Sequence, residues 1–418
     1  MRVLSVVRTV LCTFVLLLVA RDARAQNAEG GTGTAGWALA SMFLLAAPLD
    51  FYGDYFGYAN DLTFSQALLS VVQRQAATFP IGSSSGGFTY AFDPQLGLPV
   101  RRTRSFGPMF AERPLTNGSH RFTVNVAAQQ TSWRALGGVD FRKGLTAIRT
   151  YKASDTVTGD AEAEYAKTRI TFRTARSVLG VNYGLTSRID VGVLLAYGES
   201  VVTGQLNYTR TDLTTGRVLV VDDREYSGVS AGVGDATFRA KFEFLSHPSV
   251  DFAAGVDVRL PTGSGFEVLG AGATQTKLTL IGAFPRGQFA PHFNVGYTLV
   301  PGYTAGVRAN SAQAANITNA DEIDYTLGAD VAVSSSVTVA GDVIGRSLLR
   351  SYNFERTVDP LVSEISMRPG TVNLLLGAAG AKVLVGREWL LNFSLAFAIN
   401  NAGLKPGLTP VIGIERPF

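Results

Sequence analysis

Regular alternation of apolar and polar residues is the feature that most constrains the fold of this chain. In DATFRAKFEF, residues 235–244, every second residue is apolar, and Arg239, Lys241 and Glu243 stand between the aromatic residues. Successive side chains of a strand point to opposite sides, so such a segment has one apolar and one polar face. Similar segments recur to the end of the chain and predict an all-β fold. We place twelve antiparallel strands at 120–133, 168–183, 188–198, 234–245, 250–260, 275–284, 289–299, 323–333, 336–346, 371–385, 389–399 and 408–418.

The connections between these segments alternate between short and long. The short ones read GLTS, SHPS, PRGQ, SS and GRE, and the long ones include 134–167, 199–233 and 347–370. Bacterial membrane barrels have tight periplasmic turns at one end and longer extracellular loops at the other, whereas a soluble sandwich has no reason to sort its loops by length. The sequence therefore predicts a transmembrane β-barrel in which Phe238, Phe242 and the other outward residues face lipid.

Residues 1–25 have the layout of a cleaved secretory signal. Arg2 and Arg8 stand in front of a short apolar run at residues 9–20, and an A-x-A arrangement ends at Ala25. The only cysteine, Cys12, lies in this leader, so we expect no disulfide in the mature chain. Beyond the leader no apolar run approaches the roughly 20 residues of a membrane helix. An exported chain with 46% hydrophobic residues then fits a soluble all-β fold or an outer-membrane barrel, and the connections favour the barrel.

Residues 26–119 lack the alternation of the strands and are expected to form a plug, with the barrel over 120–418. TFSQALLSVVQRQ at 63–75 predicts a short amphipathic helix, and FTYAFDP with PVRRTRSF around QLGL predicts a hairpin that could raise the strand count to fourteen. A segment of this size is too small and irregular to form a good domain of its own, which favours a place in the lumen. A loosely ordered periplasmic extension is the alternative.

Inward-facing polar residues form the candidate functional site. Charges of both signs can pair across neighbouring strands, and unpaired charges in a dry interior would destabilise the barrel by several kcal/mol each. These residues could brace the barrel and dock the plug, or contact cargo, and both roles stay open. We also expect the plug residues Arg101, Arg102 and Arg104 to pair with acidic lumen residues, namely Asp251, Asp257, Asp324, Asp330 and Asp342. The candidate lumen-lining residues are Asp235, Arg239, Lys241, Glu243, Asp251, Asp257, Arg259, His292, Asn294, Asp324, Asp330 and Asp342.

Aromatic residues near the strand ends predict an interfacial girdle, because their rings suit a boundary between lipid and water. The last strand ends on Phe418, with Ile412 and Ile414 in phase behind it, which predicts a terminal signal for the barrel assembly machinery. The girdle candidates are Trp133, Tyr183, Tyr197, Phe244, Tyr297, Tyr325 and Trp389.

The stretches FTYAFDPQLG, SFGPMFAERP, LTSRIDVGV, RLPTGSGFEVLGAGATQTK and APHFNVGYT resemble those of the bacterial phenol-degradation transporters, relatives of the long-chain fatty-acid and aromatic-hydrocarbon channels. The resemblance covers most of residues 80–418. It implies a monomeric barrel of the Gram-negative outer membrane, in contact with lipopolysaccharide, whose N-terminal segment enters the lumen as a hatch. It also implies passive transport of small hydrophobic solutes.

Other classes of function find less support in the residues. His120, His247 and His292 lie far apart without Cys, Asp or Glu at ligand spacing, so we expect no metal site, no cofactor and no catalytic residue. The leader holds three of the four net positive charges, which leaves no support for a nucleic-acid partner. The alternatives are an outer-membrane phospholipase, for which His247 and Ser249 are the nearest pair, and a structural barrel without transport.

Overall fold

The chain folds into one closed antiparallel barrel. The computed structural model describes residues 31–46, 69–83, 85–93, 98–151, 161–301, 321–358, 363–386 and 388–418. Within these ranges twelve strands form the barrel, each paired with the next along the chain, which confirms the expected all-β fold and strand number. The barrel strands are β4 (Phe122–Leu136), β7 (Glu162–Gly184), β8 (Ile189–Asp212), β9 (Val218–His247), β10 (Val250–Leu260), β11 (Gln275–Ala283), β12 (Phe289–Leu299), β13 (Glu322–Ala332), β14 (Val337–Val358), β15 (Ser363–Val385), β16 (Trp389–Ala398) and β18 (Thr409–Pro417).

Pairing of the last barrel strand with the first closes the barrel. β18 runs antiparallel to β4, from the Val411↔Gln129 pair to the Pro417↔Thr123 pair. Beyond the strand ends, Phe418 and Phe122 exchange backbone hydrogen bonds, and their rings stack with centroids 4.7 Å apart. The terminal aromatic residue therefore helps to close the seam, and its role as an assembly signal with Ile412 and Ile414 stays a prediction.

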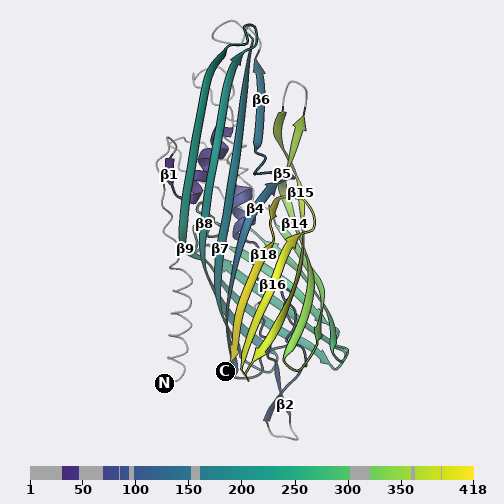
Figure 1. Cartoon of the computed structure of the whole chain (residues 1–418). Helices are drawn as coiled ribbons and strands as arrows, with labels where there is room; N and C mark the ends of the chain where they lie inside the picture. Colours follow the sequence, from purple (N-terminus) through teal and green to yellow (C-terminus); the bar gives the residue numbers. More distant parts are fainter. Residues whose placement is uncertain are drawn as a thin grey trace.

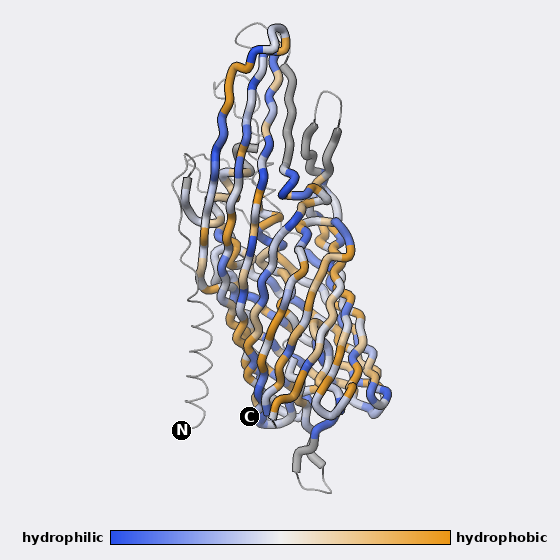
Figure 2. Tube along the Cα trace, in the orientation of Figure 1, coloured by the Kyte–Doolittle hydropathy of each residue, from blue (hydrophilic) through white to orange (hydrophobic). Residues whose placement is uncertain are grey.

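The two faces of the wall differ as the alternation predicts. Phe238, Phe242 and Phe244 are 50%, 47% and 44% exposed on the outer face, whereas Lys241 and Glu243 are buried on the inner face. Figure 2 shows hydrophobic and hydrophilic residues alternating along the barrel strands. An outer face of large apolar side chains is stable only against hydrocarbon, so the barrel crosses a lipid bilayer through its strands. No helix in the described ranges is long and apolar enough to span a membrane.

Several predicted long loops are largely strand. β8 continues to Asp212 and β9 begins at Val218, so most of 199–233 is a tall hairpin, and much of 347–370 belongs to β14 and β15. Residues 134–167 contain the end of β4, β5 (Val139–Asp140), β6 (Leu145–Tyr151) and the start of β7. These extensions rise at the top of Figure 1, opposite the short turns and the C-terminus. The predicted strands ended too early because the outer faces of these extensions stand in water and carry polar residues such as Thr203 and Gln205, so the lipid-facing alternation is lost there.

Polar ladders hold the tall hairpins together. Tyr208 donates a hydrogen bond to Glu164 at 2.7 Å, Asn207 donates to Asp223 at 2.8 Å, and Arg210 pairs with the buried Glu162. Such cross-strand pairs stabilise a sheet without a lipid-facing side.

The N-terminal segment lies partly against the tall hairpins and partly in the lumen. β1 (Gly31–Gly33) pairs in parallel with β9, and α2 (Ala35–Ala46) follows it. A second helix covers 69–77, whereas the prediction placed it at 63–75, and residues 63–68 lie outside the described ranges. The predicted hairpin forms as β2 (Tyr90–Asp93) and β3 (Leu98–Arg101), but these two strands pair only with each other, so the barrel keeps twelve strands rather than fourteen.

α2 packs against the inner faces of the tall strands. Its Ala- and Leu-rich sequence favours a helix, and Thr34 begins it by accepting the Trp37 N–H through its hydroxyl. Leu39 and Met42 join Phe172 and Val202 in the largest apolar cluster. Gly204 of β8 allows the close approach, because a side chain there would collide with Met42. The main core therefore includes the inside of the barrel half that carries the tall hairpins.

Trp133, one of the predicted girdle residues, does not lie on the lipid-facing side of the wall. Trp133 is buried and faces the lumen, where its ring meets Phe79 edge-on at 5.3 Å and stacks on Phe172. Its position at the end of a predicted strand suggested the interface, but β4 continues beyond it, which places Trp133 beneath the N-terminal helices.

Candidate functional site

The lumen holds a plug formed by residues 85–89 and 102–117, which docks on charged residues of β8 and β9, while the β2–β3 hairpin extends beyond the short turns (Figure 1). Glu243 accepts two hydrogen bonds from Arg102, at 2.8 and 3.0 Å, and a third from the Thr116 N–H at 3.2 Å. Lys241 donates to the carbonyl oxygens of Arg113 and Leu115, at 3.1 and 2.6 Å. Both wall residues are buried: Glu243 is neutralised by Arg102 of the plug, whereas Lys241 lies 3.4 Å from Asp190 of the wall and also holds the plug backbone.

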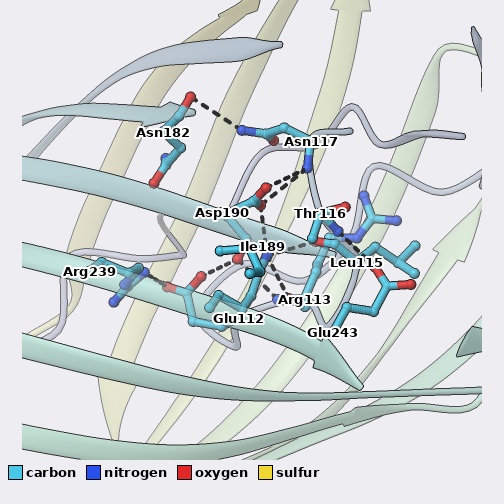
Figure 3. A network of polar contacts seen from close by, with 12 residues as sticks. Glu112, Arg113, Leu115, Thr116, Asn117, Asn182, Ile189, Asp190, Arg239 and Glu243 are labelled. Atoms are coloured by element: carbon cyan, nitrogen blue, oxygen red, sulfur yellow. Dashed lines mark hydrogen bonds and ion pairs between the residues drawn. The ribbon is translucent and has the colours of Figure 1, made fainter. Parts of the chain in front are cut away.

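A second group of contacts continues this network along the same strands (Figure 3). The two carboxylate oxygens of Asp190 accept the Asn117 N–H at 3.2 and 3.1 Å. Arg239 lies between Glu112 of the plug and Asp257 of the next strand, at 2.7 and 2.6 Å. The plug is therefore fixed through its backbone and its side chains together.

His292 links the plug to three further strands. Its Nδ1 lies 3.1 Å from Asp330 and its Nε2 lies 2.7 Å from Asp342. Asp342 also accepts the backbone N–H groups of Met109 and Phe110, at 3.1 and 2.8 Å, and Asp330 accepts the Ser105 hydroxyl. His292 is thus a hydrogen-bonded wall residue, and Asp342 holds the plug backbone directly.

Two of the three plug arginines do not form the expected pairs. Arg102 reaches Asp251 at 3.5 Å besides its main partner Glu243. The Arg101 guanidinium instead lies 4.0 Å from the Phe106 ring centroid and donates to the Arg104 carbonyl, while Arg104 itself is exposed. The arginines leave the chain in different directions around the hairpin, so a run of like residues could not all reach one acidic surface.

The remaining predicted residues line an internal cavity of about 320 Å³, here called the central cavity, between the plug and the wall. Asp324 pairs there with Lys277. Asn294 lies beside the backbone of Glu112, with which its amide bonds in the flipped orientation. All twelve predicted residues therefore face the lumen or the plug, and a role in transport stays a proposal. The cavity-lining members of the predicted set are Asp235, Arg239, Asp257, Arg259, Asn294 and Asp324.

Some functional candidates were missed. Asp190 and Glu415 are buried on the inner faces of β8 and β18, and Glu415 accepts the Gly87 N–H of the plug at 2.7 Å. The alternation of their strands could have identified both. Glu112 lies on an irregular segment, and nothing in the local sequence indicates its position.

A cavity of about 460 Å³, here called the turn-side cavity, opens near the short turns and is lined by residues such as His247, Pro248 and Pro285. Glu112 lines both this cavity and the central cavity. The plug segment around Glu112 therefore lies between the two cavities.

The walls of the central cavity differ in character. Apolar residues come from β4, β7, β8 and β14, namely Ala127, Val178, Leu194, Ala196 and Ile344. Charged residues come mainly from β9 to β14, and include Arg239, Asp257, Arg259, Lys277 and Glu322. A small molecule with an apolar body and a polar end matches such a space better than a purely polar one.

The serine and histidine considered for hydrolysis do not form a nucleophile and base. His247 Nδ1 accepts the backbone N–H of Ser249 at 3.4 Å, so their contact does not involve the serine hydroxyl. In the part of the chain that the structure describes, no three His, Cys, Asp or Glu side chains group as metal ligands. The two ring nitrogens of His292 face different carboxylates, so they could not share one ion.

No family model and no curated protein matches this sequence. Among solved structures, an outer membrane channel from Pseudomonas putida F1 has a TM-score of 0.47 at 14% identity, over 73% of this chain and 97% of that one. The P. putida toluene transporter TodX has a TM-score of 0.34 at 8% identity, covering 71% and 90% of the two chains. The Ralstonia pickettii toluene transporter TbuX has a TM-score of 0.32 at 11% identity, covering 72% and 90%.

Similarities this low carry no information about cargo. The barrel is established by its own strand pairing, and the resemblance to the phenol-degradation transporters stays a prediction. The functional conclusion rests on the residues of this chain.

Proposed function

We propose that the protein is an outer-membrane channel through which small, largely hydrophobic compounds pass without energy input. One observation carries the proposal: a membrane barrel holds a docked plug with a cavity on each side, and one wall of the central cavity is apolar. A barrel of purely structural function has no need of an apolar strip inside its lumen. Removing the apolar part of a solute from water is favourable, so this strip draws such solutes into the cavity.

Passage requires the plug to move only locally. The segment around Glu112 separates the two cavities, and its side chain is held by Arg239. Displacement of this segment would join the cavities while the remaining contacts keep the plug in place. The direction of net flux then follows the concentration gradient.

Several finer statements belong to the same proposal. The leader and the barrel support export to the outer membrane of a Gram-negative cell, where the tall hairpins would stand among lipopolysaccharide. Closure within one chain supports a monomer. Phenol-type and fatty-acid-type compounds are the cargo classes that the sequence resemblance suggests.

Uptake by Gram-negative cells that express the protein tests the proposal. Cells with the wild-type protein should take up labelled toluene or decanoate faster than cells with empty vector, and should show no gain for a sugar of similar mass. Ala196→Trp fills the central cavity and should abolish the gain. Leu195→Trp, on the neighbouring lipid-facing position, is the matched control and should retain it.

Equal uptake with and without the protein, for every compound in the panel, would refute a channel function. Calcium-dependent phospholipid hydrolysis by the purified protein would support the enzyme instead.

A further inference from the structure

We propose that the central cavity binds a singly charged carboxylate with a small apolar body, whose carboxylate is held by Arg259 and Arg176. The inference deepens the proposed function and rests on it, because it names the class of cargo that the same lumen accepts. Four observations about the cavity carry it.

Three of the six cations that line the cavity are neutralised by carboxylates in contact with them, and a fourth, Lys382, donates to the carbonyl oxygen of Phe106 at 3.3 Å. Arg239 lies between Glu112 and Asp257, at 2.7 and 2.6 Å. Arg346 pairs with Glu322 at 2.6 Å, and Lys277 pairs with Asp324. These ion pairs leave little free charge for a ligand.

Arg259 and Arg176 differ from these cations. The contact of Arg259 is a long one, 3.3 Å to the neutral amide oxygen of Gln275. Arg176 donates to the carbonyl oxygens of Ala77 and Val268, which are also neutral. Among the described residues neither guanidinium has a carboxylate within ion-pair distance. A guanidinium has five N–H donors, so Arg259 keeps donors for a ligand that enters the cavity.

Asp235 is the acidic residue whose charge attracts Arg259 most strongly, and it is already engaged. Its two oxygens accept the backbone N–H groups of Gly263 and Ala271, at 3.1 and 2.7 Å. One carboxylate held by backbone groups faces two guanidinium groups, which leaves a local excess of one positive charge. A singly charged anion restores the balance, whereas a doubly charged anion would meet Asp235 and Asp257 as repelling neighbours.

The apolar wall begins directly beside Arg176. Val178 follows it on the same face of β7, and Val178 is paired in register with Ala196 of β8. A carboxylate at the arginines therefore directs its apolar body along this strip. The volume of about 320 Å³ is at the lower end of the range for small-molecule sites. This size favours an aromatic or short-chain acid.

Carboxylates suit this pair better than neutral solutes do. The planar guanidinium matches a carboxylate in a two-bond geometry, and the hydrogen bonds are strengthened by charge. A neutral apolar solute would displace water from Arg259 and give it no partner. The site should therefore discriminate by charge among solutes of similar shape.

Binding of benzoate, benzamide and acetate to the purified full-length protein in detergent tests the inference. Benzoate should bind at least about tenfold more tightly than benzamide, which lacks the charge, or acetate, which lacks the ring. Arg259→Gln should weaken benzoate binding by about tenfold or more and leave benzamide binding unchanged. Arg188→Gln, at an exposed turn, removes the same charge elsewhere and should have no effect.

Equal affinities of the wild-type protein for benzoate and benzamide would overturn the inference, as would full retention of benzoate binding in a folded Arg259→Gln variant. The wild-type comparison decides the matter if the variant fails to fold. Toluene uptake by cells separates the two proposals. Uptake without selective benzoate binding refutes only the carboxylate site, and selective binding without any uptake refutes only the channel.

Discussion

Asp342→Ala should release the plug while the barrel stays folded. The Asp342 side chain is fully buried and accepts hydrogen bonds from the backbone of Met109 and Phe110, while its partner His292 is 2% exposed. The substitution leaves two plug N–H groups and one imidazole nitrogen without an acceptor. Breaking a buried charged pair of this kind destabilises by about 3–5 kcal/mol, and each unsatisfied buried donor by about 1–3 kcal/mol. We therefore expect the substitution to destabilise the docked state of the plug by about 3–5 kcal/mol.

Trypsin provides the assay, because Arg102 and Arg104 lie in the plug and neither is followed by a proline. The variant should be cut there at trypsin concentrations that spare the wild-type plug, and its single-channel conductance should rise. Its heat-modifiable mobility on gels should persist, since the twelve strands pair without the plug.

Two variants act as controls. Val343→Ala changes the neighbouring outward residue, which is 40% exposed, and should behave as wild type. Asp342→Asn keeps one acceptor oxygen and should lie between wild type and Asp342→Ala. Unchanged trypsin protection and conductance in a folded Asp342→Ala protein would show that this carboxylate does not hold the plug.

Four more outcomes are expected. Phe242→Arg places a charge in lipid and should destabilise the folded barrel by about 2–4 kcal/mol if the site is near the midplane, whereas Phe242→Leu should fold normally. Equal yields of folded barrel from the two variants would contradict the assigned faces. Deleting residues 27–116 should raise single-channel conductance more than deleting 27–82, because 85–117 carry the docking contacts; no rise in either would exclude a plug. Single cysteines at Thr215 should be labelled on intact cells and those at Ser249 should not, and the reverse pattern would invert the topology. The hydrogen bond from the Val300 N–H holds the pKa of Asp321 below its usual value of 3.8. This contact should therefore persist down to pH 3.8 and be lost only at lower pH, which hydrogen exchange at Val300 would measure, and Asp321→Asn should remove the pH dependence.

The sequence alone determined the barrel and the facing of its residues. Alternation is a local property, since each strand residue must meet either lipid or the lumen whatever its distant partners are. Phe238, Phe242 and Phe244 could therefore be assigned to the outer face and Lys241 and Glu243 to the inner face, and both assignments are confirmed. The short turns were predictable for the same reason, because the alternation of apolar and polar residues stops where a strand ends and the chain reverses direction.

Contacts between the plug and the wall were decided only by the tertiary structure. Glu112 meets Arg239, and Met109 and Phe110 meet Asp342, although the partners are separated by more than a hundred positions along the chain. Which residues face each other across a lumen depends on the strand number, the register and the path of the plug, and no local pattern records these together. The height of the hairpins was hidden as well, because their outer faces are polar and their apolar inner faces pack against α2, a segment distant in the sequence. Arg259 belonged to the predicted lumen set, but its lack of a contacting carboxylate became visible only once Asp257 was seen to pair with Arg239 and Glu322 with Arg346 in the closed barrel.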